Sequence, residues 1–333
     1  MRDGSPLVEV AGFGSGAVSS PPSLKRTAEH PALRPDDKAA TLSGVVLDGR
    51  YRIVRKLGEG GMAYVYLAEE QGTNVKLAIK VLSPSLANEA DSAARLRREA
   101  ELAMRLNHPN VCRILRYDET AEGLRYLVMP YLEGETLSDR EVRDGTMPVH
   151  EGIPLLVQIC AGVQHAHSIQ ILHRDLKPEN VMLVPDRRMP GNVRAVVMDF
   201  GLAKELRAGP EIQKLTSTGV VLGTPEFMSP EQIRGKTLDG RSDIFALGVL
   251  AFEMLSGELP FSGGTAQELM MARLKGQPRA MRTFKPDVPQ RVESVVAKAL
   301  TREREGRYPT MEAFSKALTE TSSHGFVGRP MIT

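Results

Sequence analysis

The sequence predicts an α+β chain with two lobes: a small antiparallel sheet carrying one main helix, then a larger and mostly helical part. Two observations support this. Between about 51 and 130, short runs of β-branched and aromatic residues are separated by glycine turns. From about 134 to 318 the apolar residues recur at helical spacing instead. The change of period near Gly134 therefore marks the boundary between the lobes.

In the first lobe, alternating runs predict five strands and one helix. The strands are expected at 51–57, 63–68, 75–81, 111–117 and 124–129. The helix is expected over 91–106, because Leu96, Ala100, Ala103 and Met104 fall at i, i+4, i+7 and i+8. His108-Pro109 follows and ends it.

In the second lobe, helices are expected at 153–167, 243–255, 266–274, 291–300 and 311–318. Residues 1–43 are rich in Gly, Ser, Pro and Ala and lack periodicity, so we expect a disordered tail there. A short C-terminal tail is expected over 319–333.

Composition excludes several classes of protein. The formal net charge is +2, which gives no electrostatic footprint for nucleic acid. The two cysteines, Cys112 and Cys160, form no C-x-x-C pair, so a reducing cytoplasm is the expected setting. No apolar run approaches the roughly 18–20 residues that cross a bilayer. Membrane insertion and a signal peptide are therefore not expected.

Two glycine-rich segments imitate nucleotide-binding loops. Gly58 and Gly60 lie between two expected strands, and Ala63 occupies the third glycine position. Glycines at such a turn let the backbone approach phosphates, although an ordinary glycine hairpin has the same pattern. The segment 12–17 resembles a dinucleotide fingerprint. However, Pro21-Pro22 follows where that fingerprint needs a helix, which argues against the dinucleotide reading.

A set of motifs further along the chain decides whether the glycine-rich segment at 58–60 is a phosphate loop or an ordinary hairpin. Each motif alone has a purely structural explanation, such as a solvated strand end or helix face, but the order of the motifs along the chain is specific. The set comprises Lys80 at the end of an apolar strand, Glu99 in the next helix, His173-Arg174-Asp175-Leu176-Lys177-Pro178-Glu179-Asn180, and Asp199-Phe200-Gly201 after an apolar run.

At these residues the sequence resembles the eukaryotic-type (Hanks-type) serine/threonine protein kinases, in their bacterial branch. The resemblance spans about 51–318 and implies the bilobal protein-kinase fold. It also implies transfer of the γ-phosphate of ATP to serine or threonine hydroxyls of proteins, with ATP and Mg²⁺ (or Mn²⁺) as cofactors.

The resemblance implies a role for each residue. Asp175 accepts or orients the substrate hydroxyl proton, and Lys177 neutralises the γ-phosphate. Lys80 holds the α and β phosphates, and Glu99 holds Lys80 in place by an ion pair once its helix moves inward. The metal ligands are Asn180 and Asp199. The nucleotide-binding residues are Leu57, Gly58, Gly60, Val65, Ala78, Lys80, Met129 as gatekeeper, Pro130 and Leu132.

Further residues follow from the same resemblance. The segment 223–231 matches the end of an activation segment, with Ser229 replacing the usual alanine. Thr224 is expected to bridge Asp175 and Lys177, and Glu231 to pair with Arg307. Asp243 is expected to brace the catalytic loop through backbone bonds.

Regulation is expected to act through the activation segment. Phosphorylation of Thr216 or Thr218 by a second copy of the chain would supply a phosphate for Arg174, which precedes Asp175. A homodimer is one partner expected on this ground, beside the protein substrates.

Two other functions fit part of the pattern. A pseudokinase would keep the fold without turnover, but Lys80, Asp175 and Asp199 are all present. A small-molecule phosphotransferase would usually lack the segment 223–231.

Overall fold

The structure is a computed structural model that describes residues 39–60, 63–83, 90–200 and 225–323. All of these residues belong to one compact unit that begins at Arg34.

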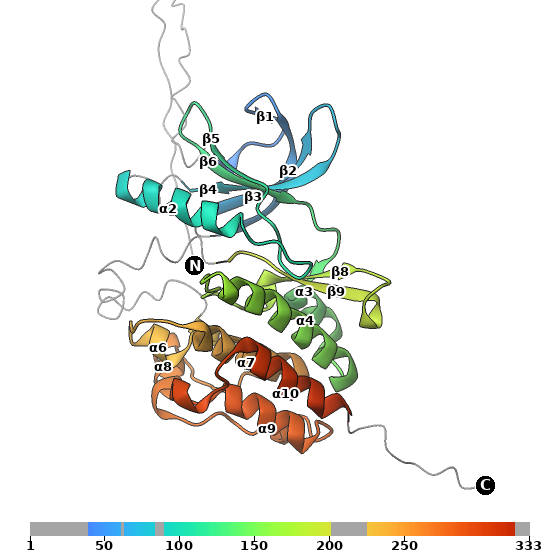
Figure 1. Cartoon of the computed structure of the whole chain (residues 1–333), viewed down its shortest axis with the longest axis vertical. Helices are drawn as coiled ribbons and strands as arrows, with labels where there is room; N and C mark the ends of the chain where they lie inside the picture. The colour runs from blue at the N-terminus through green and yellow to red at the C-terminus, as the bar shows by residue number, and fades with distance from the viewer. Residues whose placement is uncertain (1–38, 61–62, 84–89, 201–224, 324–333) are drawn as a thin grey trace, which may run out of the picture. The chain divides into compact units, whose positions relative to one another are not determined.

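The first half of the described chain forms a six-stranded sheet whose neighbouring strands all run antiparallel (Figure 1). The strand order is β1-β2-β3-β4-β6-β5. The helix α2 lies alongside this sheet (Figure 1). The bounds are β1 Val46–Leu47, β2 Tyr51–Gly60, β3 Ala63–Glu70, β4 Lys76–Leu82, α2 Ala90–Ala103, β5 Arg116–Glu119 and β6 Arg125–Pro130.

The alternation of β4 shows how sequence places side chains in this sheet. Leu77, Ile79 and Val81 are buried on one face, whereas Ala78 and Lys80 are half-buried on the other. Successive side chains of a strand point to opposite faces. Burial of Leu77, Ile79 and Val81 in the core therefore places Ala78 and Lys80 on the opposite face of β4.

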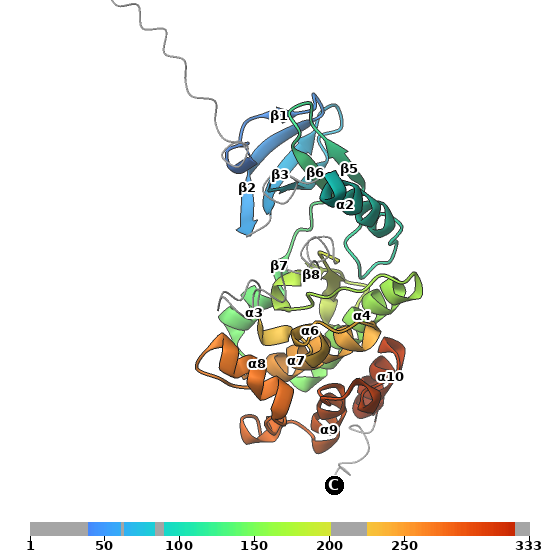
Figure 2. The same cartoon turned by 90° about the vertical axis from the view of Figure 1, so that its left-hand side faces the viewer.

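The second half contains a group of helices (Figure 2). It also contains a small sheet of order β7-β8-β9. The strands are β7 Glu135–Thr136, β8 Val181–Pro185 and β9 Val193–Val197. The helices are α3 Leu137–Asp144, α4 Val149–Ser168, α6 Pro230–Ile233, α7 Gly240–Ser256, α8 Ala266–Lys275, α9 Gln290–Ala299 and α10 Met311–Ser323. Short 3₁₀ turns occur at Pro178–Asn180, Pro190–Asn192, Pro225–Phe227, Met281–Thr283 and Arg304–Gly306.

Helix α7 forms the centre of this helical part. From Ser242 to Ser256 every residue except Glu253 is buried, as expected for a helix that is apolar all round. The Asp239 side chain caps its first turn, and Gly257, with φ of 75°, ends it in the left-handed conformation. The helix therefore gives the neighbouring loops a rigid support.

The expected elements are largely present, with corrections. The strand expected at 111–117 is wrong for its first half, because β5 begins only at Arg116. Val111 instead bridges Val197, and Cys112 donates to the Val197 carbonyl, so this segment packs on β9. The strands β1, β7, β8 and β9 and the helices α3 and α6 were not anticipated.

The expected N-terminal tail also needs correction near its end. Ala39 and Leu42, which fall within 1–43, are buried in the apolar cluster of the six-stranded sheet. The Tyr66 hydroxyl donates to the Ala39 carbonyl at 2.6 Å. Packing therefore begins before the boundary that composition indicated. Within the described residues, no helix is both long and apolar enough to cross a membrane.

Candidate active site

Three strands place the expected nucleotide-binding residues on neighbouring positions. Val65 on β3 lies opposite Lys80 on β4, and Ala78 on β4 lies opposite Met129 on β6. Pro130 is the last residue of β6. The remaining apolar positions, both half-buried, are Leu57 on β2 and Leu132 after β6. The antiparallel register thus assembles a surface of apolar side chains with Lys80 at one end.

The glycines of the phosphate loop lie at the end of β2, paired with the start of β3. A Cβ added at Gly58 or Gly60 would meet no described atom within 4 Å. Packing among the described residues therefore does not require glycine at either position. Ala63 differs, because it is buried in a small cluster with Leu82 and Leu96. Its methyl group supports the junction between the sheet and α2.

Lys80 forms an ion pair with Asp199, at 2.7 Å between Nζ and Oδ1. Burial raises the pKa of Asp199, and the charge and hydrogen bond of Lys80 more than offset this, so that the pKa is lowered. Asp199 has φ of 57°, a left-handed conformation that non-glycine residues rarely adopt. Between the described residues Lys80 pairs with Asp199 and not with Glu99, so the expected Lys80–Glu99 pair is not formed here.

A buried carboxylate in the first turn of α7, that of Asp243, anchors the loop that carries Asp175. Asp243 accepts from the His173 N–H at 2.9 Å and from the Arg174 N–H at 2.8 Å. A third bond, at 2.7 Å, joins it to the His167 ring. Burial raises the pKa of Asp243, but its bonds to His167 and His173 lower it overall, so the group stays ionised. The brace expected at Asp243 is confirmed.

His173 links this loop to the strand end before Asp199. Its Nδ1 accepts from the Asp175 N–H at 3.2 Å, which leaves Nε2 as the protonated nitrogen that donates to the Met198 carbonyl at 2.8 Å. Complete burial lowers the pKa of His173, in keeping with a neutral ring. The ring also contacts Phe200 in a tilted arrangement, with centroids 4.8 Å apart and an interplanar angle of 59°. A neutral histidine therefore holds the segments of Asp175 and Asp199 together.

Asp175, Lys177 and Asn180 form the polar centre of the loop. The Asn180 amide nitrogen donates to the Asp175 carbonyl at 2.8 Å and lies 3.5 Å from its carboxylate. The Lys177 ammonium lies 4.0 Å from the same carboxylate. The Met198 N–H donates to the Asn180 carbonyl at 2.8 Å, which ties this centre to the strand that leads to Asp199.

Comparison with known proteins agrees with this geometry. The protein kinase domain family matches residues 51–318. The chain belongs to the protein kinase family. PrkC, a serine/threonine-protein kinase of Bacillus subtilis, is 39% identical over 271 residues, covering 81% of this chain and 40% of PrkC. Pkn1, a serine/threonine-protein kinase of Myxococcus xanthus, is 38% identical over 313 residues, covering 91% of this chain and 43% of Pkn1.

This kinase chain thus spans less than half the length of those two relatives. The crystal structure of the Mycobacterium tuberculosis PknI kinase domain has a TM-score of 0.65 at 28% identity, covering 84% of this chain and 98% of that one. The bacterial Hanks-type resemblance and the bilobal α+β fold are therefore confirmed.

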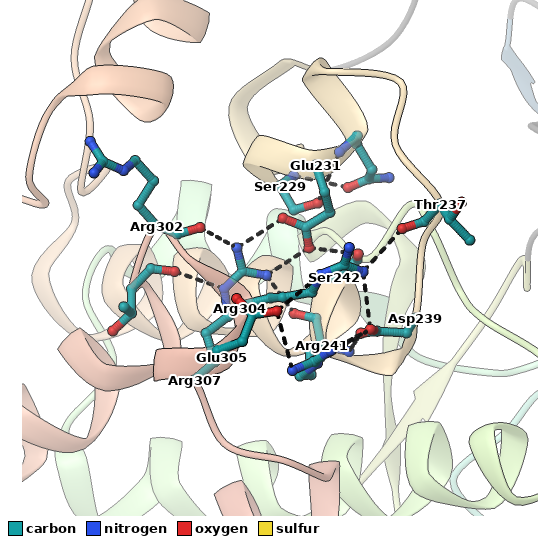
Figure 3. Close-up of polar contacts among 12 residues, drawn as sticks. Ser229, Glu231, Thr237, Asp239, Arg241, Ser242, Arg302, Arg304, Glu305 and Arg307 are labelled. Atoms are coloured by element: carbon teal, nitrogen blue, oxygen red, sulfur yellow. Dashed lines mark hydrogen bonds and ion pairs between the residues drawn. The ribbon is translucent and has the colours of Figure 1, made fainter.

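The structural ion pair expected in the kinase's helical lobe is also confirmed. The Arg307 guanidinium donates to both carboxylate oxygens of Glu231, at 2.7 and 2.9 Å (Figure 3). Both side chains are almost fully buried. This pair fixes the end of the expected activation segment to the loop before α10.

Behind the gatekeeper position of the kinase site lies a small internal cavity. It is lined by Ala103, Leu106, Cys112, Ile114, Leu127, Met129, Asp199 and Phe200. Burial raises the pKa of Cys112 to about 12, so its thiol is protonated at neutral pH and is a poor nucleophile. The cavity shares Met129 and Asp199 with the candidate site, and its protonated thiol adds no second chemistry.

Two contacts of the kinase site were missed in the sequence. His167 is a partner of Asp243, and no local pattern in the sequence shows this. Ser229 and Gln232 form a capping box at the start of α6. The S-x-x-Q pattern of a capping box is visible in the sequence and could have revealed it.

Some expectations concern residues outside those described. They are the roles of Thr216, Thr218 and Thr224, Gly201 in the Asp-Phe-Gly sequence, and the dinucleotide-like segment 12–17.

Proposed function

We propose that this kinase transfers the γ-phosphate of ATP to serine or threonine hydroxyls of proteins. The observation that carries the proposal is the joining of two segments: His173 and Asn180 bond the Asp175 loop to the strand end that presents Asp199. Asp175 receives or orients the hydroxyl proton. Lys177, close to Asp175, offsets the charge of the transferred phosphate.

The nucleotide is proposed to lie against β3, β4 and β6. The face that carries Val65, Ala78 and Met129 offers an apolar surface for a base, and the Pro130 carbonyl and Leu132 N–H would bond it. Gly58 and Gly60, where packing among the described residues demands no glycine, would let the backbone approach the phosphates. Lys80 supplies a positive charge at the end of this surface.

Asn180 and Asp199 fit a hard divalent cation. The Asn180 amide nitrogen is used by the Asp175 carbonyl, so the amide oxygen is the group available for a metal. Among the described residues no cluster of three or more His, Cys, Asp or Glu side chains forms a metal cage. A two-residue site suits Mg²⁺, which keeps waters and phosphate oxygens as its other ligands. Such a cation would neutralise phosphate charge.

We further propose that activation involves Glu99 and the activation segment. Glu99 would become the partner of Lys80 when α2 moves toward β4, releasing Asp199 for the metal. Phosphorylation of Thr216 or Thr218 by a second copy of the chain would stabilise that state, because a phosphate forms charge-assisted bonds with arginines such as Arg174. Such phosphorylation would serve bacterial signalling, in keeping with the similarity of the chain to bacterial serine/threonine-protein kinases such as PrkC.

The test is incubation with ATP and Mg²⁺ and a generic protein substrate, with phosphopeptides mapped by mass spectrometry. Wild-type protein should phosphorylate serine or threonine residues, while Asp175→Asn and Lys80→Met should lose several orders of magnitude in turnover with unchanged thermal melts. Nucleotide binding without phosphopeptides would indicate a pseudokinase. Phosphorylation confined to small molecules would indicate the phosphotransferase.

A further inference from the structure

The peptide bond between Arg174 and Asp175 is held on each of its two polar groups. Its carbonyl accepts a hydrogen bond from Gln232 Nε2 at 2.8 Å. Its N–H, which belongs to Asp175, donates to His173 Nδ1 at 3.2 Å. Arg174 itself has φ of 64°, a conformation rare for a residue with a side chain. The plane of this peptide sets the direction in which the Asp175 side chain leaves the backbone.

Gln232 uses both ends of its amide. While Nε2 donates to the Arg174 carbonyl, Oε1 accepts from the Ser229 N–H at 2.9 Å, closing the capping box of α6. Each end has the partner that its chemistry requires, an acceptor for the nitrogen and a donor for the oxygen. Rotating the amide by 180° would break both bonds, so the side chain is fixed in one orientation.

Gln232 belongs to a segment that is anchored elsewhere in the helical lobe. This segment, residues 226–232, is called the strap here. Glu231 is paired with Arg307, and Arg273 of α8 donates to the carbonyl oxygens of Glu226 and Met228. Arg273 is itself buried, with 1% of its surface exposed. The strap is thus fixed to α8 at one end and to the loop before α10 at the other.

We propose that Gln232 is a positioning residue for the catalytic carboxylate of Asp175. It transmits the position of the anchored strap to the Arg174–Asp175 peptide. Asp243 holds the Arg174 N–H from the α7 side, and Gln232 holds the carbonyl from the strap side. With one of these supports removed, the rare conformation of Arg174 would be less restricted. This inference rests on the proposed role of Asp175 in phosphoryl transfer.

The two functions of Gln232 are separable by substitution. Gln232→Glu keeps an oxygen for the Ser229 N–H and retains a capping-box sequence, but an ionised carboxylate donates nothing to the Arg174 carbonyl. Ser229→Ala does the reverse. It removes the hydroxyl that accepts from the Gln232 N–H at 3.4 Å and leaves the Gln232 side chain in place.

The experiment measures steady-state phosphorylation of a peptide, with active enzyme counted by stoichiometric nucleotide binding. Gln232→Glu should lower kcat about three- to tenfold, the loss expected for one ordinary hydrogen bond, with KM for ATP within about twofold of wild type. Ser229→Ala should keep kcat within about twofold while lowering the melting temperature. If Gln232→Glu does not fold, Gln232→Met takes its place in the kcat measurement, because it removes the bonds to both the Arg174 carbonyl and the Ser229 N–H.

The outcomes separate cleanly. An unchanged kcat in Gln232→Glu, or in Gln232→Met where that variant is used, would overturn the positioning role. An equal loss of kcat in Ser229→Ala would also overturn it, since capping alone would then explain the effect. Wild-type protein without turnover would instead refute the proposed function.

Discussion

Replacing Arg307 by methionine should cost this kinase a large share of its stability. The substitution keeps an unbranched apolar stem and removes the guanidinium. In addition to the two bonds to Glu231, that group donates to three backbone carbonyl oxygens, those of Thr301, Arg302 and Arg241, at 2.7 to 2.9 Å (Figure 3). Without the guanidinium, Glu231 would be a buried carboxylate that has lost its paired cation.

The size of the effect follows from burial. The side chains of Arg307 and Glu231 are 0% and 6% exposed. Water therefore cannot take the place of either partner when the other is removed. Breaking a buried ion pair by removing one partner costs about 3–5 kcal/mol. A shift of roughly 2–4 °C per kcal/mol gives a fall in melting temperature on the order of 10 °C. Urea titration and thermal melts would measure it.

A matched control lies in the same network. Arg304 pairs with Asp239 at 3.1 Å, but these side chains are 28% and 39% exposed. Arg304→Met should therefore cost only about 1 kcal/mol or less. If Arg307→Met destabilised the protein no more than this control, the argument from burial would be refuted. The double variant Glu231→Gln with Arg307→Met should lose less than the sum of the single losses.

The pair should also show a characteristic pH dependence. Burial raises the pKa of Glu231, but the bonds and charge of Arg307 more than offset this and lower it below the ordinary 4.5. A lowered pKa in the folded state stabilises the fold above pH 4.5, and the contribution is lost as the pH falls through the lowered value. The difference between wild type and Arg307→Met should therefore shrink in acid.

Three other predictions concern the rest of the chain. Ala63→Gly should cost about 1 kcal/mol in urea titrations, because a buried methyl is lost and glycine is more flexible when unfolded, with little change in kcat. A chain beginning at residue 44 should have a free energy of unfolding about 2 kcal/mol lower than one beginning at residue 38, because Ala39 and Leu42 are buried. Burial and neighbouring glutamates raise the pKa of Glu141 to about 8, so stability should fall as pH rises from 4.5 to 8, and Glu141→Gln should recover about 1–2 kcal/mol at pH 8.

The sequence predicted the elements whose signals are local. The strand β4, which carries Lys80, and the central helix α7 follow from periodicity, and the Asp175 loop follows from contiguous residues. The first half of the expected strand at 111–117 failed because Val111 pairs with Val197 across the fold, a tertiary contact that overrides local propensity.

The parts of the site that the sequence did not reveal depend on distant contacts. Gln232 reaches a carbonyl 58 residues earlier in the chain. The partner of Lys80 likewise depends on where α2 and the Asp199 segment lie, whereas the resemblance to protein kinases gave Glu99 as the expected partner. Composition also placed Ala39 in a tail, because one buried alanine leaves no periodic signal.

The pairing of Lys80 with Asp199 leads to the last prediction. In the proposed complex, Lys80 holds phosphates and Asp199 holds the cation, so both must give up the 2.7 Å contact that they share here. Their side chains are 15% and 34% exposed, so the pair should oppose binding by on the order of 1 kcal/mol, or roughly fivefold in Kd. Asp199→Asn should therefore bind ATP more tightly than wild type when no metal is present, and more weakly when Mg²⁺ is added.

The control for this crossover is Asp175→Asn. This substitution also removes a negative charge from the site. The Asp175 carboxylate, however, lies 4.0 Å from Lys177, whereas the partner of Lys80 is Asp199. If the two variants strengthened metal-free ATP binding equally, the gain would reflect net charge and not release of Lys80. A gain confined to Asp199→Asn, measured by calorimetry with and without Mg²⁺, would mean that Lys80 is held back from the phosphates until the cation takes Asp199. Such competition would couple nucleotide binding to metal binding through one lysine.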